Sequence, residues 1–199
     1  CTGITEVYLD TAFNADNIKM VQLFDGCTSL TKLVAINSFN GSYTSYATGY
    51  LSNAFLNCKL TDVTLTDCLK ATNSNANGMF YNAFNNSAAN VTPTVTLTRV
   101  GTGANANLRL MFQDCHYLKR VNFTDVGTGS RALLSRMFWN CNALQTVNLT
   151  RVGTGQGAEM YQMFTLCGTS TNATQIAKDT TSTWKFTDVG NNCANLRSM

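Results

Sequence analysis

Residues 107–129, NLRLMFQDCHYLKRVNFTDVGTG, decide the fold because their apolar positions change period partway along. From Leu108 to Cys115 the apolar residues follow an i, i+3, i+4, i+7 spacing, which is typical of one face of an amphipathic helix. From Val121 to Phe123 they alternate with polar residues, which is typical of a strand. This stretch therefore predicts a short helix followed by a short strand.

The same pattern recurs along the chain with a period of about 26 residues. A Met-Phe pair or its equivalent stands at six places, with its second residue at Phe24, Phe55, Phe80, Phe112, Phe138 and Phe164. Three residues after each of these comes a small apolar residue: Cys27, Cys58, Ala83, Cys115, Cys141 and Cys167. The repetition predicts units that are equivalent in structure.

One strand and one helix cannot bury both of their apolar faces alone, so the units are expected to stack into a solenoid. We predict an α/β fold that resembles a leucine-rich-repeat solenoid, with one short helix and one short parallel strand per coil and about seven coils. The chain is expected to be a single repeat domain, 1–199, and a segment of a longer chain. The approximate coils are 1–26, 27–57, 58–82, 83–114, 115–140, 141–166 and 167–199.

The motif Met-Phe-x-x-Cys-x-x-Leu-x-x-Val-x-Leu, seen as MFWNCNALQTVNL at 137–149, resembles the BspA-like leucine-rich repeats of bacterial and protist surface proteins and some phage proteins. The resemblance covers nearly the whole chain. It implies a non-catalytic, outward-facing scaffold used in adhesion or recognition. A parallel β-helix is the main competing fold, and the helical spacing before each Cys argues against it.

Five cysteines occupy one repeat position and are expected to form a structural column of buried free thiols: Cys27, Cys58, Cys115, Cys141 and Cys167. Side chains that point in the same direction do not satisfy disulfide geometry. Cys68 and Cys193 lie outside this position and are the cysteines most open to pairing. His116, the only histidine, follows Cys115, but its counterparts in other units are not catalytic types, so neither a Cys/His nucleophile nor a zinc site is predicted.

Charge alternates at the residue before each turn valine or its equivalent, which predicts a structural charge ladder between coils. Its members are Asp67, Arg99, Asp125, Arg151 and Asp188. Two neighbouring columns are expected to line the exposed face of the sheet. These are Thr66, Thr98, Thr124, Thr150 and Thr187, and Thr64, Thr96, Asn122, Asn148 and Lys185. The repeated Gly-Thr-Gly after these strands is interpreted as a scaffold turn and not as a phosphate-binding loop.

Insertions in irregular units are the places where function would sit, and they span 37–50, 85–94 and 168–183. The first carries tyrosines that could supply aromatic surface of the kind binding loops favour, and packing of the rings within the loop is the competing interpretation. The candidate binding surface therefore comprises Tyr43, Tyr46, Tyr50, Asn122, Asn148 and Lys185.

The charge content and the lengths of the apolar runs argue against two kinds of partner, nucleic acid and membrane. Charged residues make up 13% of the chain and the net charge is +3, so nucleic acid is not an expected partner. No apolar run reaches the roughly 18–20 residues that a membrane span needs, so no membrane insertion is expected. We expect an extracellular or cell-surface scaffold that binds a protein or glycan on another surface, with no enzyme activity and no cofactor. The alternative is a virion protein, such as a phage tail fibre or receptor-binding appendage, and an oligomer is possible in either case.

Overall fold

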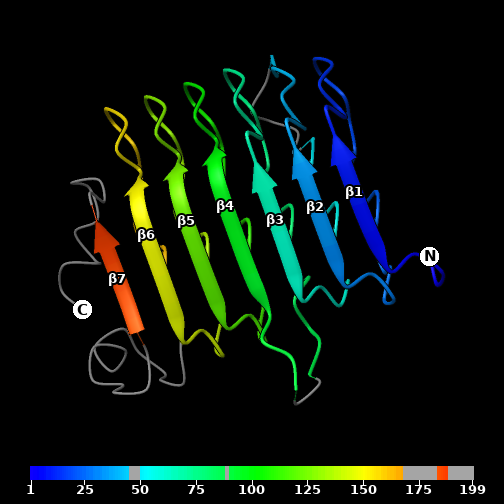
Figure 1. The fold of residues 1–199 in the computed structure, drawn as a ribbon. Helices are drawn as coiled ribbons and strands as arrows, with labels where there is room; N and C mark the ends of the chain where they lie inside the picture. Colours follow the sequence, from blue (N-terminus) through cyan, green and yellow to red (C-terminus); the bar gives the residue numbers. More distant parts are fainter. Residues whose placement is uncertain (45–49, 88–89, 168–182, 188–199) are drawn as a thin grey trace.

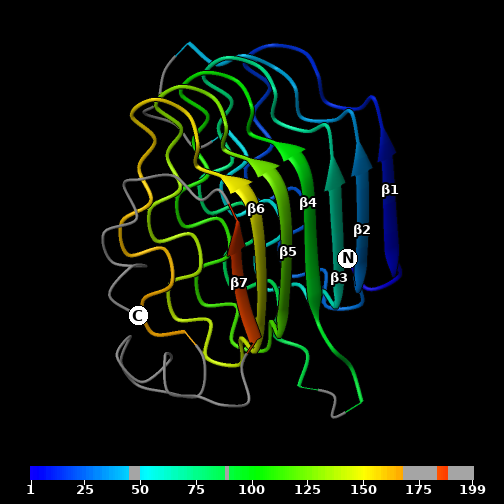
Figure 2. The ribbon, with the colours of Figure 1, turned by 60° about the vertical axis from the view of Figure 1, so that its left-hand side comes forward.

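Seven parallel strands form one sheet in a computed structural model of the chain, which describes residues 1–44, 50–87 and 90–167 and the backbone of 183–187. The strands are β1 (Glu6–Asp10), β2 (Lys32–Ile36), β3 (Asp62–Thr66), β4 (Thr94–Val100), β5 (Arg120–Val126), β6 (Thr146–Val152) and β7 (Thr183–Thr187). They lie side by side in chain order (Figure 1). All neighbouring pairs are parallel, and between β1 and β6 the described parts of the connections return behind the sheet to start the next strand (Figure 2).

The predicted solenoid with a parallel sheet is confirmed, and two details of the prediction are wrong. The described chain makes about five turns and not seven coils. The described residues also contain no helix, so the fold is a parallel β-solenoid and not an α/β repeat.

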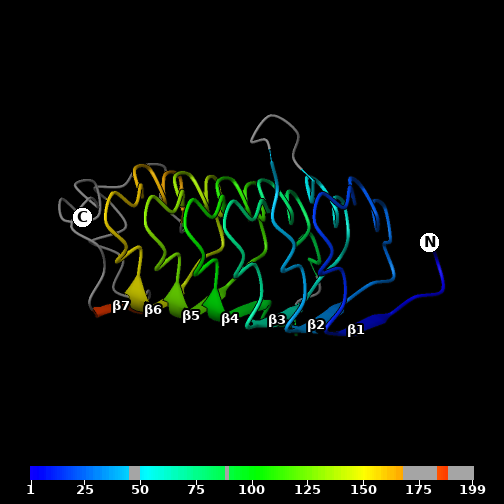
Figure 3. The ribbon, with the colours of Figure 1, turned by 90° about the horizontal axis from the view of Figure 1, so that it is seen from above.

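Turns replace the predicted helices because many backbone amides bond to the neighbouring coil, and the bonds within a segment span three residues, as Gln113 N to Leu110 O does at 3.1 Å. Leu108 N donates to Leu133 O of the next coil at 2.8 Å, and Phe112 N donates to Met137 O at 2.9 Å. An α-helix would direct these amides to carbonyls four residues earlier in the same segment. The apolar residues Leu108, Met111, Phe112 and Cys115 still point inward, as their spacing in the sequence requires. The coils stack in a row behind the sheet (Figure 3).

Left-handed backbone recurs at equivalent places in every turn segment. Within one coil, Leu110 has a φ of 56° and Asp114 a φ of 57°, and Gly78 (62°) occupies the Leu110 position in the coil before. Such residues reverse the chain direction locally, and asparagine, aspartate and glycine tolerate this conformation best. Two left-handed residues four positions apart therefore bend the chain twice in each turn segment. The helix prediction did not include these bends.

The core lies between the sheet and the turn segments and consists of columns of identical or similar side chains. The rings of Phe80, Phe112 and Phe138 stack with centroids 5.1 and 5.4 Å apart and are fully buried. Inward strand residues such as Val121 and Leu97 are also fully buried. Stacked rings and aliphatic columns of this size contribute most of the stabilising burial.

Candidate binding surface

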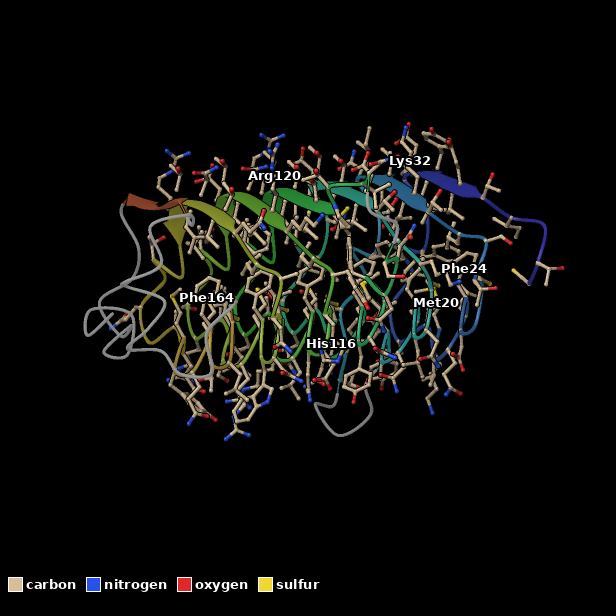
Figure 4. The ribbon with its side chains drawn as sticks, turned by 90° about the horizontal axis from the view of Figure 1, so that it is seen from below. Met20, Phe24, Lys32, His116, Arg120 and Phe164 are labelled. Atoms are coloured by element: carbon tan, nitrogen blue, oxygen red, sulfur yellow. The ribbon has the colours of Figure 1, made fainter. Side chains whose placement is uncertain are left out.

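The outer face of the sheet is polar and follows from the strand alternation. In β4, Val95 and Leu97 are fully buried, whereas Thr96 and Thr98 between and after them are partly exposed. Figure 4 shows Lys32 and Arg120 on the outward side of the same sheet. A strand that buries alternate residues must present the others to solvent.

Strand register lines the outward residues up in rows across the sheet. One row contains Thr64, Thr96, Asn122, Asn148 and the backbone position of Lys185. The next contains Thr66, Thr98, Thr124, Thr150 and the backbone position of Thr187. Adjacent strands lie about 4.8 Å apart, so hydroxyl and amide groups repeat regularly along each row. Asn148 Nδ2 donates to Asn122 Oδ1 at 2.8 Å, which fixes the orientation of the amides.

The tyrosines of the first insertion do not belong to this surface. Tyr43 and Tyr50 are 2% and 6% exposed and stack on each other with ring centroids 4.2 Å apart. The prediction that they supply exposed aromatic surface is therefore wrong, because ring burial in the loop outweighs their exposure to solvent. Burial also raises the pKa of Tyr43 to about 12. Tyr46 lies outside the described residues.

Exposed aromatic surface comes instead from residues that the sequence analysis did not select. Tyr8 on β1 is 60% exposed, and Lys32 Nζ lies 5.3 Å from the centre of its ring. The sequence could have predicted the exposure of Tyr8, because Tyr8 stands between the inward positions Val7 and Leu9 of an alternating strand. On the back of the solenoid, Tyr161 is 46% exposed.

The charged column forms two bidentate ion pairs next to the polar rows. Arg99 Nε and Nη2 donate to Asp67 at 2.9 and 2.6 Å, and Arg151 Nε and Nη2 donate to Asp125 at 2.5 and 2.6 Å. The hydrogen bond from Arg99 lowers the pKa of Asp67, and that from Arg151 lowers the pKa of Asp125. Asp188 lies outside the described residues.

The cysteine column is buried, and four of its five thiols donate hydrogen bonds to backbone carbonyls. Cys27, Cys58, Cys115, Cys141 and Cys167 are free thiols with at most 2% exposure. Sγ of Cys115, Cys141 and Cys167 donates to the carbonyl oxygen of Phe80, Phe112 and Phe138, respectively, at 2.8–3.2 Å.

The thiol of Cys115 is thus bonded away from the neighbouring His116. Cys68 is also a buried free thiol, bonded to Ala35 O at 3.4 Å, and Cys193 lies outside the described residues.

Close contact between successive coils explains the glycines of the Gly-Thr-Gly turns. A Cβ on Gly129 would overlap the carbonyl oxygen of Gly103 in the coil before, and a Cβ on Gly155 would overlap that of Gly129. The glycines therefore allow the backbones of successive coils to approach closely. No group of three metal-ligating side chains that could hold an ion occurs in the described residues. A helix long and apolar enough to cross a membrane is likewise not found among them.

The fold and the outward rows define this chain as a parallel β-solenoid with a polar, hydroxyl- and amide-rich face. Neither a protein-family model, nor a curated protein, nor a solved structure matches the chain.

Proposed function

We propose that the chain is a non-catalytic recognition scaffold that works outside the cell and binds a protein or glycan on another surface. The observation that carries the proposal is the in-register array of partly exposed threonine and asparagine side chains on the outer face of the sheet. The resemblance of the repeat motif to BspA-like surface proteins supports the same role.

Two physical features suit this array to recognition. Its hydroxyls and amides act as both donors and acceptors, so they can match many polar partners. The array is also rigid, because every strand is held on both sides by parallel neighbours from β2 to β6. A rigid surface loses little conformational entropy when it binds.

The low content of charged residues, 13%, fits a surface that contacts partners through short polar side chains. Next to the rows, Asp67 with Arg99 and Asp125 with Arg151 neutralise each other. Binding at this face therefore depends on hydrogen bonds and contact area more than on net charge.

The test is to probe glycan arrays and intact bacterial and host-cell surfaces with the labelled chain, together with a variant that carries Thr96→Lys and Asn122→Lys. The two lysines should disrupt the centre of the array and reduce binding about tenfold or more, whereas Thr28→Lys, on an exposed turn before β2, should leave it unchanged. Full binding by the double lysine variant would contradict the assignment of the sheet face.

A further inference from the structure

Arg136 occupies an unusual setting on the turn segments opposite the sheet. Its guanidinium carbon lies 4.9 Å from the ring centre of Trp139 and 5.9 Å from that of Tyr161, which belongs to the next coil. Its Nε donates to Gln162 Oε1 at 2.7 Å. The guanidinium is thus held by two aromatic rings and one amide.

The other arginines with close polar contacts are already neutralised. Arg99 pairs with Asp67, Arg151 with Asp125, and Arg109 with Glu159. Among the residues that the structure describes, no carboxylate pairs with Arg136, and no hydrogen bond uses its Nη groups. Arg136 is also an exposed residue. Its charge is therefore oriented but not balanced.

The stacking of two coils holds the cluster in place. Arg136 N donates to Tyr161 O at 3.1 Å, and Trp139 N donates to Arg136 O at 3.2 Å. These backbone bonds fix the bases of all three side chains relative to one another. A guanidinium that is already oriented loses less entropy when its Nη groups bind a ligand.

We propose that Arg136, Trp139 and Tyr161 form a binding site for a sugar that carries a carboxylate. Arginine matches the two oxygens of a carboxylate with two parallel hydrogen bonds. Tyr161, which is 46% exposed, and the partly exposed Trp139 offer flat apolar ring surface, where the guanidinium does not cover it, of the kind that packs on the carbon face of a sugar ring.

Arg109 and Glu159 pair with each other and add little net charge, so Arg136 supplies the attraction for the anion. This inference rests on the proposed recognition role, for which it names a ligand class and a second surface.

The experiment measures the binding of trigalacturonic acid and of sialyllactose to the full chain by isothermal titration calorimetry. At least one should bind, and its methyl ester should bind at least about tenfold more weakly because the charge is lost. Arg136→Gln should weaken binding about tenfold or more. Arg136→Lys should also weaken it, because lysine keeps the charge but lacks the planar fork.

Arg131→Gln is the matched control, since Arg131 is an exposed arginine of the same coil that lies outside both the sheet and the Arg136 cluster. It should leave binding unchanged. Tyr161→Leu tests the ring without removing the charge, and it should weaken the sugar acids more than it weakens acetate. Urea unfolding of each variant shows whether it is folded.

Three results would overturn the inference: no binding of either sugar acid, equal binding by Arg136→Gln, or acetate binding as tightly as the sugar acids. If the chain still binds cell surfaces through the sheet face in that case, the proposed function stands without this site. If the sugar acids bind as expected but no cell or array surface is bound, the site stands and the surface role fails.

Discussion

Cys141 Sγ donates a hydrogen bond of 3.1 Å to the carbonyl oxygen of Phe112, one coil earlier in the stack. The same relationship joins Cys167 to Phe138 and Cys115 to Phe80. Each thiol therefore satisfies a carbonyl group of the neighbouring coil while it fills a small space in the core. The cysteines act as structural side chains, and this leads to the first prediction.

Thiol reagents should distinguish the cysteine column from the chain terminus. Cys1 is exposed, whereas the other described cysteines are buried free thiols. Reaction requires the thiolate, and burial raises the pKa of Cys58 to about 12 and that of Cys68 to about 11. Iodoacetamide at pH 8 should label Cys1 in the folded protein, and mass spectrometry should find Cys58 and Cys68 labelled only after unfolding. Rapid labelling of Cys58 in the native state would contradict its burial.

The free energy of unfolding should decrease in alkaline solution. The folded-state pKa of Cys58 is about 12 and lies above the ordinary thiol value of 9.0, so the stabilisation is complete below pH 9 and is lost as the pH rises toward 12. Each such thiol should contribute a slope of about 1.4 kcal/mol per pH unit in that range. Urea titrations at pH 7, 9 and 10.5 measure this loss.

Cys58→Ala is the control for the alkaline effect, because Ala83 fills the equivalent position in the next coil. The variant should show a shallower decline above pH 9 than the unmodified chain. An identical decline would assign the alkaline effect to other groups.

Gly129→Ala should destabilise the solenoid strongly. Its Cβ would overlap the carbonyl oxygen of Gly103, and backbone cannot move aside as a flexible side chain can. The expected loss is about 1–3 kcal/mol or more, as for other overpacked sites. Gly3→Ala is the matched control, since nothing lies within 4 Å of its Cβ position. Thermal unfolding of the two variants provides the comparison, and equal midpoints would contradict the close approach of the coils.

Two substitutions at one repeat position should have opposite effects on stability. Gly78 has a φ of 62° and a Cβ there would meet Asn53 Oδ1 at an ordinary 3.5 Å, so Gly78→Ala should cost about 1–2 kcal/mol through backbone strain alone. Leu110 has a φ of 56° at the equivalent position. Leu110→Gly should relieve that strain, and the greater flexibility of the unfolded chain should offset part of the gain. The free energy of unfolding should therefore rise by about 0 to 1 kcal/mol. Urea unfolding measures both, and a large loss in Leu110→Gly would show that its side chain contributes more than its backbone costs.

Removing one arginine should raise the pKa of its partner carboxyl. The hydrogen bond from Arg151 is the main cause of the lowered pKa of Asp125, so Arg151→Gln should return this pKa toward its ordinary value. In the unmodified chain the stabilisation from Asp125 is present above pH 3.8 and is lost as the pH falls through the lowered folded-state pKa. NMR titration of the carboxyl carbons measures the shift. Arg120→Gln should leave Asp125 unchanged, and a shift of similar size there would assign the effect to overall charge.

The sequence by itself determined the repeat, the parallel stacking and the inward columns. Phe112, Cys115 and Val121 recur at equivalent places, and only stacked units can bury such recurring apolar residues together. The outward rows that contain Asn122 and Thr124 followed from the same alternation, because a strand with one buried face must expose the other.

Only the tertiary structure decided how the chain returns from one strand to the next. The spacing between Leu108 and Cys115 fits a helix, but hydrogen bonds from Leu108 and Phe112 to the next coil satisfy the amides without one, and left-handed residues supply the turns. Tertiary packing also buried Tyr43 against Tyr50 and brought Arg136 between Trp139 and Tyr161. These contacts depend on distances between coils and within loops, which a repeat pattern read along one chain does not specify.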